Sequence, residues 1–374
     1  MSGYALLARA WGAEIGGWDR VRTPYLERLS GVDVVISDEP PAPPAGWEVF
    51  VSSAFTGRVE GKSRAELLAE LVSLRDSVVV AGAHGKTTTA GMIAFCLARL
   101  GRDPAWLIGG DIPQLGGNAG AGEGWLVVEG DESDRTIAAL RPGLAVVTNV
   151  DLDHHTTFGS RAEVEELFSR WLAAVPEVIR CDELPPYEGP LTLRGEHNRR
   201  NAACALATLG RLGVTRAAAE PVLAEFTGAG RRLERRGEAG GVEVYDDYAH
   251  HPAEIEATLE AARDGGRLLV LFQPHLYSRT RHLARELAAA LAHADVVAVT
   301  NVYPAREEPQ PGVSGKLIVD ALGELRPGMP LGWTPSVADG AHFLSQRARS
   351  GDRVLTIGAG DVDRAADLLL GALA

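Results

Sequence analysis

The sequence predicts an α/β fold built on parallel sheets. From residue 77 to about 227, apolar runs of strand length alternate with helix-like runs, and a second alternation begins at about residue 228. Such alternation is typical of parallel sheets with helices on both faces. A glycine-containing turn between an apolar strand and a helix adds the expectation of a phosphate site. We expect an N-terminal part (1–76), a central nucleotide-binding domain (77–227) and a C-terminal domain (228–374).

The composition is that of a globular protein of 374 residues, with 45% hydrophobic and 23% charged side chains. The net charge of −13 argues against broad binding to nucleic acid or anionic membranes, because both require a basic surface. No apolar run approaches the ~20 residues of a membrane span, and the N-terminus lacks the layout of a signal peptide. We expect a cytoplasmic protein, a monomer or homodimer, with no nucleic acid and no membrane as partner.

The three cysteines, Cys96, Cys181 and Cys204, lie in unrelated contexts and lack the spacing of metal ligands. We expect them to be buried thiols in a reducing cytoplasm.

The first 76 residues carry weaker signals. A short helix is expected at 4–11, strands at 13–19, 32–37 and 49–53, and a helix with regularly spaced leucines at 62–74. Asp19 closes the first of these strands in the position of a ribose-binding acid, but the glycine loop that should precede it is missing, so the signal is weak.

The phosphate site is predicted where the apolar run 78–81 ends. The loop reads Gly82-Ala83-His84-Gly85-Lys86-Thr87-Thr88, and a helix is expected at 90–100. Position 80 is valine rather than the glycine of the general Walker pattern, so the loop is a tighter variant. Loop amides and the helix N-terminus would face an anion, Lys86 would add a point charge, and the Thr87 hydroxyl could bind Mg²⁺. The alternative is a structural glycine turn.

Acidic residues follow the next strand, 125–128. Three acids within four positions, Glu129, Asp131 and Glu132, repel one another and suggest a cation at the strand end. Glu129 is the favoured Mg²⁺ ligand, with Asp131 or Glu132 as weaker candidates. The strand 144–148 leads to Asn149 and His154, and spacing alone favours a hydrogen-bonding role for His154, because imidazole is an uncommon Mg²⁺ ligand. The intervening stretch 109–120 is too glycine-rich for regular structure.

Further polar clusters remain ambiguous on spacing alone. Asn198 and Asn201 lie in the first turn of a helix, where amides could read a base edge, although Asn198 could equally be an N-cap. Arg231 and Arg232 form either a polyphosphate clamp or a solvated turn. In the last domain, strands are expected at 242–245, 268–272, 296–299 and 353–357, and polar residues follow each of them.

Taken together, these motifs resemble those of the Mur ligases, the ATP-dependent amide-bond-forming enzymes of peptidoglycan synthesis. The family shows, in order, Gly-Thr-His-Gly-Lys-Thr-Thr, Glu-Ala-Asp-Glu-Ser-Asp, Asn-x-x-x-Asp-His, His-Asn-x-x-Asn-Ala, Gly-x-x-Arg-Arg, Asp-Asp-Tyr-Gly-His-His-Pro, Phe-Gln-Pro-His-Arg-Tyr-x-Arg, Glu-Glu-Pro and Gly-Ala-Gly-Asp. Each has a counterpart between Val78 and Asp361. Ser133 and the block His250-His251-Pro252 favour the branch that adds L-alanine to UDP-N-acetylmuramate.

The resemblance implies the fold and the site. It implies a reduced Rossmann-like N-terminal domain, a P-loop ATPase-type central domain and a Rossmann-like C-terminal domain. It implies ATP and Mg²⁺, with Lys86 on phosphate, Thr87 and Glu129 on one Mg²⁺ and His154 on a second. The nucleotide would be bound by Gly82, His84, Gly85, Lys86, Thr87, Thr88, Asn198, Asn201, Arg232 and Asp246. Ser133, Tyr248, His250, His275 and Arg279 would face the muramoyl and amino-acid substrates, with His250 or His275 as candidate base.

Some positions depart from the family pattern. Leu276 replaces an arginine that in the family reaches the nucleotide-sugar substrate, which could weaken binding by ~1.5–3 kcal/mol. Ala83 and Ala249 replace a threonine and a glycine. The N-terminal part lacks the family's first strand and Gly-x-Gly-Gly-x-Gly loop, through either a late start assignment or a true loss. We therefore keep a paralogue that binds ATP but not the usual substrate as the alternative. Folylpolyglutamate synthases share the phosphate loop but lack the Glu-Ser-Asp and His-His-Pro combination.

Overall fold

The chain forms two compact units in the computed structural model, which describes residues 1–374 except 53, 54, 56, 153–156 and 306. The first unit comprises Met1–Thr192 and Asn198–Thr227, and the second comprises Leu193–His197 and Gly228–Ala374. The division of the first unit at residue 76 stays a prediction, and His154 lies outside the described residues.

The main sheet of the first unit has the strand order β10-β9-β5-β8-β6-β7, parallel except for the antiparallel pair β6–β7. Its strands are β5 (Ser77–Ala81), β6 (Ala105–Ile112), β7 (Gly117–Gly120), β8 (Leu126–Glu129), β9 (Leu144–Val147) and β10 (Glu177–Arg180). Strands β5 and β9 are buried along their whole length, as expected when both faces of a parallel sheet are covered.

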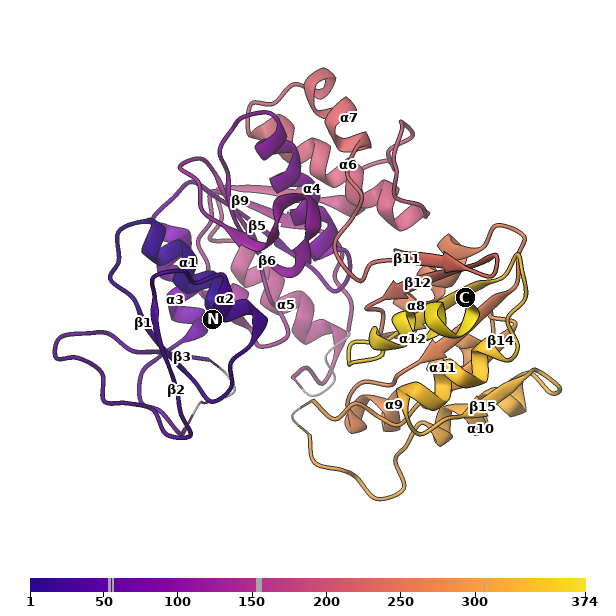
Figure 1. Cartoon of the computed structure of the whole chain (residues 1–374). Helices are drawn as coiled ribbons and strands as arrows, with labels where there is room; N and C mark the ends of the chain where they lie inside the picture. The colour runs from indigo at the N-terminus through magenta and orange to yellow at the C-terminus, as the bar shows by residue number, and fades with distance from the viewer. Residues whose placement is uncertain (53–54, 56, 153–156, 306) are drawn as a thin grey trace. The chain divides into compact units, whose positions relative to one another are not determined.

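Helices cover this sheet on both faces (Figure 1). One core joins alternate residues of the sheet, such as Val79 and Ala81, to Leu7, Leu68 and Trp171 of α1, α3 and α5. Helix α4 packs against β5, β6 and β8, and α7 packs against α4. The helices of the first unit are α1 (Ser2–Ala10), α2 (Pro24–Glu27), α3 (Arg64–Ser73), α4 (Lys86–Arg99), α5 (Arg161–Leu172), α6 (Glu196–Arg211, whose first residues belong to the second unit) and α7 (Arg216–Ala224), with short 3-10 turns η2 (Pro113–Leu115), η3 (Thr136–Ala139) and η4 (Cys181–Glu183).

The N-terminal part holds two small parallel pairs. Strand β1 (Gly16–Asp19) pairs with β2 (Asp33–Ile36), and β3 (Phe50–Val51) pairs with β4 (Lys62–Ser63). Helix α3 begins at Arg64, slightly later than expected, because Ser63 and Glu66 form a capping box that fixes its first turn.

Two predictions about the central sheet were wrong. Helix α4 begins at Lys86 rather than at residue 90, because Gly85 adopts a left-handed conformation that turns the chain directly into the helix. The stretch 109–120 was expected to be irregular, yet it contains the end of β6 and all of β7. Gly120 pairs with Trp106, and a Cβ at Gly120 would lie 2.2 Å from the indole ring. The glycine therefore admits the large ring beside the strand.

The second unit contains a sheet of strand order β11-β12-β16-β13-β14-β15, parallel except for β11. Its strands are β11 (Glu234–Ala239), β12 (Val242–Asp247), β13 (Leu268–Phe272), β14 (Val296–Val299), β15 (Leu331–Trp333) and β16 (Arg353–Ile357). Its helices are α8 (Pro252–Ala262), α9 (Tyr277–Leu291), α10 (Lys316–Leu325), α11 (Val337–Ser345) and α12 (Arg364–Leu373). Val270 belongs to the core under α8–α10, while Leu271 belongs to the core under α11 and α12. Helices thus cover both faces, and the predicted α/β class is confirmed.

Within the described residues, no helix combines the length and apolar character that crossing a membrane would require.

Candidate functional site

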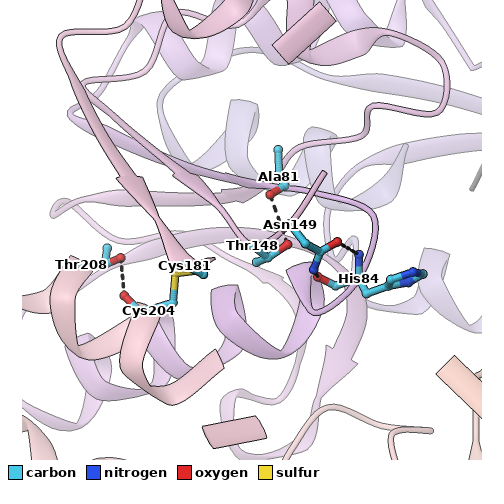
Figure 2. Close-up of a disulfide and its surroundings, with 7 residues drawn as sticks. All are labelled: Ala81, His84, Thr148, Asn149, Cys181, Cys204 and Thr208. Atoms are coloured by element: carbon cyan, nitrogen blue, oxygen red, sulfur yellow. Dashed lines mark hydrogen bonds between the residues drawn. A yellow bond between two sulfur atoms is a disulfide. The ribbon is translucent and has the colours of Figure 1, made fainter. Parts of the chain in front are cut away.

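The phosphate loop connects β5 to α4, as predicted. Gly82 and Gly85 have φ values of +144° and +83°, which side chains other than glycine rarely adopt. A Cβ at Gly82 would lie 2.1 Å from the Thr148 hydroxyl oxygen, so the loop lies directly against the end of β9. The backbone of His84 is held by a reciprocal pair of hydrogen bonds with the Asn149 amide, at 3.0 Å and 2.8 Å (Figure 2). The loop conformation is therefore fixed by residues that follow the neighbouring strand.

The ammonium group of Lys86 is turned toward its own loop. It donates to the carbonyl oxygens of Gly82 (2.5 Å) and Ala83 (3.2 Å) and to the carboxylate of Glu132 (3.0 Å). Burial is the largest single effect and lowers the pKa of Lys86, but the carboxylates of Glu132 and Glu129 outweigh it, so the pKa is raised overall. Lys86 is therefore a cation in the position expected for a phosphate-binding lysine.

Thr87 and Glu129 are brought together, as expected for a shared metal. The Thr87 hydroxyl donates to Glu129 Oε2 at 2.9 Å, and the Gly109 amide donates to the same oxygen at 2.7 Å. Hydroxyl and carboxylate oxygens are the donors that Mg²⁺ prefers, and Mg²⁺ usually takes its remaining ligands from water and phosphate. The pair therefore fits Mg²⁺, although no cluster of three acidic, histidine or cysteine side chains suited to a metal occurs in the described part of the chain. Thr88 follows within α4 and is buried.

The other acids after β8 have protein partners of their own. Asp131 accepts from the backbone and hydroxyl of Ser133 at 2.8 Å and 2.5 Å, and it lies 3.5 Å from Arg64. Asp134 pairs with the same arginine at 2.8 Å. The acidic run is thus neutralised by several separate contacts, and Glu129 is the member that accepts a hydrogen bond from Thr87, the other predicted metal ligand. The hydroxyl of Ser133 points to Asp131 in this arrangement.

Helix α6 places its two amides beside the phosphate loop. Asn198 and Asn201 are buried, and Asn201 Nδ2 donates to Asn198 Oδ1 at 3.2 Å. A Cβ at Gly85 would lie 2.4 Å from Asn201 Oδ1, so this side chain contacts the loop at its second glycine. Asn198 lies inside the helix, which begins at Glu196, and is not its N-cap.

A disulfide joins Cys181 to Cys204, so the prediction of free thiols at these positions was wrong (Figure 2). The two cysteines are 23 residues apart, and folding brings the turn after β10 onto the middle of α6. Spacing in the sequence gave no sign of this approach. Cys96 is a buried free thiol, as expected, and burial raises its pKa to about 12, so it stays protonated.

In the second unit, the paired arginines surround the end of β12. Arg231 bonds Asp246 at 2.7 Å and the carbonyl oxygens of Gly358 and Gly360. Asp246 is fully buried and also accepts from Thr356, and burial raises its pKa despite the arginine. Arg232 stacks over the ring of Tyr248, with its guanidinium carbon 5.5 Å from the ring centroid. The guanidinium carbon of Arg231 lies 5.3 Å from the same ring centroid, so both arginines lie beside a predicted substrate residue, and Arg231 is in addition bonded to Asp246.

The predicted substrate residues of this unit form a cluster. The ring centroids of Tyr248 and His250 are 5.5 Å apart, and those of His250 and His275 are 5.8 Å apart. Arg279 Nη1 lies 3.4 Å from His275 Nδ1. The cluster includes Tyr303, whose ring stacks on His275 at 6.0 Å. Tyr303 follows the predicted strand 296–299, and nothing in the sequence pattern indicates this stacking.

Comparison with known proteins shows to which family the chain belongs. Residues 231–360 match the family described as Mur ligase, glutamate ligase domain. A UDP-N-acetylmuramate–L-alanine ligase of Renibacterium salmoninarum is 40% identical over 366 residues, covering 83% of this chain and 77% of the relative. The chain belongs to the Mur ligase family.

Other relatives of this Mur ligase extend the match to its full length. A UDP-N-acetylmuramate–L-alanine ligase of Rubrobacter xylanophilus is 37% identical over 435 residues, covering 100% of this chain and 97% of the relative. The crystal structure of the UDP-N-acetylmuramate–alanine ligase of Thermotoga maritima superposes with a TM-score of 0.78 at 24% identity, covering 99% of this chain and 96% of that chain. The fold of this Mur ligase is therefore that of the family.

Proposed function

We propose that this Mur ligase joins L-alanine to the carboxylate of UDP-N-acetylmuramate, with ATP as the energy source, in peptidoglycan synthesis. The observation that carries the proposal is its 37% identity, over its whole length, to a ligase named for that reaction. The phosphate loop supports the ATP-dependent part of the proposal. In it, Lys86 bonds Glu132, and Thr87 bonds Glu129.

In the first step, a carboxylate oxygen of the muramoyl group attacks the γ-phosphorus of ATP, and the bond to the β–γ bridging oxygen breaks. The products are an acyl phosphate and ADP. Catalysis of such a transfer depends on positioning and on stabilising charge on the phosphoryl oxygens. Lys86 and the amides of residues 84–87 supply positive charge at the loop. Mg²⁺ held by Thr87 and Glu129 would supply further charge neutralisation there, and His154 is the proposed ligand of a second ion.

In the second step, the amine of L-alanine attacks the acyl carbon, phosphate leaves, and the amine gives up a proton. His250 and His275 are the proposed bases. His250 Nδ1 lies 2.9 Å from the Tyr248 carbonyl oxygen, which favours the tautomer with hydrogen on Nδ1 and a lone pair on Nε2, the state that a base requires. For the other residues we propose the following roles: adenine binding for Asn198 and Asn201, nucleotide binding for Arg232 and Asp246, and substrate binding for Ser133, Tyr248 and Arg279.

The ligase is proposed to act in the cytoplasm, where both ATP and the nucleotide-sugar substrate are available, as a monomer or homodimer.

The test is a phosphate-release assay with ATP, Mg²⁺, UDP-N-acetylmuramate and L-alanine. Phosphate should appear only when all four are present, and mass spectrometry should find the alanyl product. Omitting alanine or the nucleotide sugar provides the control for simple ATP hydrolysis. Phosphate release that does not depend on the sugar nucleotide would contradict the proposal.

A second candidate is a Mur ligase that binds ATP but takes a different acceptor, and Leu276 is the observation that favours it. Leu276 stands at the start of α9 with φ of +69°, a conformation that is rare for leucine, and it replaces the arginine expected there. Calorimetric titration with UDP-N-acetylmuramate separates the two candidates. Micromolar binding would exclude a changed acceptor, whereas no binding in the presence of bound MgATP would favour it.

A further inference from the structure

The ammonium group of Lys86 has a full set of hydrogen-bond acceptors within the protein. An ammonium group has three hydrogen-bond donors, and Lys86 has three acceptors in the structure: two loop carbonyl oxygens and Glu132 Oε1. Glu132 is 3% exposed, so this ion pair is shielded from solvent. A phosphate that binds Lys86 must therefore replace one of these acceptors.

The two carbonyl groups are poorly placed to give way. The Ala83 amide donates to the Asn149 carbonyl oxygen, and Asn149 also holds the backbone of His84. Moving the Gly82 or Ala83 carbonyl would break this connection between the loop and the end of β9. Glu132 reaches Lys86 through a side chain with rotatable bonds, so the carboxylate is the acceptor that a phosphate would displace.

Charge at the loop also disfavours a bare polyphosphate. Asp131 has Arg64 as a nearby cation, whereas Glu129 contacts Thr87 and Glu132 contacts Lys86, so these two carboxylates lie beside the position proposed for the phosphates. Each carboxylate repels a polyanion at this short range. Free ATP carries a charge of about −4, and a bound divalent cation halves that charge and is itself attracted to carboxylates.

We propose that Glu132 is a specificity-determining residue that makes nucleotide binding depend on a divalent cation. It competes with the phosphates for Lys86 and repels the metal-free nucleotide, while a nucleotide that carries Mg²⁺ can overcome both effects. The inference rests on the proposed function, because it assumes that ATP is the ligand of this loop.

The test compares ATP binding in Mg²⁺ and in EDTA by isothermal calorimetry. Substitution Glu132→Gln keeps the size of the side chain and removes its charge. We expect binding of metal-free ATP to become about tenfold tighter, while binding of MgATP changes by less than about threefold. The matched control is Glu123→Gln, which removes one charge from an exposed ion pair with Arg75 in the same unit and should leave both affinities unchanged.

Removing the partner of a buried lysine can destabilise the fold, so Glu132→Asp serves as the second variant. It keeps the charge, and metal-free binding should remain as weak as in the wild type. If the wild type binds nucleotide but Glu132→Gln has the same ratio of MgATP affinity to metal-free ATP affinity as the wild type, the inference is overturned and the proposed function stands. Absence of MgATP binding by the wild type would refute both.

Discussion

Breaking the disulfide between Cys181 and Cys204 should destabilise the first unit. The bond fixes the turn after β10 to the middle of α6, and its Cα–Cα distance of 5.3 Å lies in the usual range for disulfides. Cys204 is fully buried on a helix whose second turn contacts the phosphate loop through Asn201. The perturbation is reduction by dithiothreitol under native conditions.

The magnitude follows from the length of chain that the bond closes. A separation of 23 residues gives a loss of unfolded-state entropy worth about 3.4 kcal/mol at 25 °C. For a unit of this size, each kcal/mol shifts the melting temperature by about 2–4 °C, so reduction should lower the midpoint by roughly 7–14 °C.

The assay is thermal unfolding followed by fluorescence, with and without reductant, at constant pH. The variant Cys181→Ala cannot form the bond and is the control, because its midpoint should not respond to dithiothreitol. Thiol titration of the unfolded protein should find one thiol before reduction and three after it. If reduction shifts the wild type by no more than it shifts Cys181→Ala, the entropic reasoning is refuted.

Three further predictions concern the loop and the second unit. Gly85→Ala should abolish nucleotide binding and lower stability by about 1–2 kcal/mol in calorimetric melts, because the φ of Gly85 is +83° and a Cβ there would meet Asn201. The control is Gly210→Ala on α6, where a Cβ would enter open space, and it should leave nucleotide binding intact and not lower stability. Lys86→Met should weaken MgATP binding at least tenfold in calorimetric titration, through loss of a charged contact worth about 1.5–3 kcal/mol. Burial raises the pKa of Asp247 from 3.8 to about 6, so its contribution to stability is present below pH 3.8 and is lost as pH rises through 6. Over this range the free energies of unfolding of wild type and Asp247→Asn, measured by urea titration, should diverge by an amount on the order of 3 kcal/mol. Parallel pH profiles would contradict this.

The sequence was most informative where one local pattern determines one element. The apolar run before Gly82 and the glycines after it predicted β5, the loop and α4, because strand burial and left-handed turns depend on nearby residues. Local composition predicted the wrong structure at 109–120. There Gly120 forms part of a strand, because its lack of a side chain leaves room for the ring of the paired Trp106.

Contacts between distant segments were beyond this kind of reasoning. The pairing of Cys181 with Cys204 depends on the packing of α6, and a count of cysteines cannot show it. Likewise, the acids after β8 were predicted as candidate ligands of a cation, and the structure shows that Asp131 and Glu132 have protein partners on α3 and α4. An acidic run in a sequence therefore predicts charge that must be neutralised, without saying whether a metal or a protein cation does so.

Helix α6 connects the features that sequence reasoning treated separately. Its middle is fixed by the disulfide, and Asn201 in its second turn lies against Gly85. Asn149, which follows β9, holds the backbone of His84. The loop is thus held between the end of β9 and a covalently anchored helix, so the main freedom left at Lys86 is the exchange of one acceptor for another. A chain with a net charge of −13 can bind a polyanion at such a point, because rigid amides and one lysine are concentrated where an acidic side chain can be displaced.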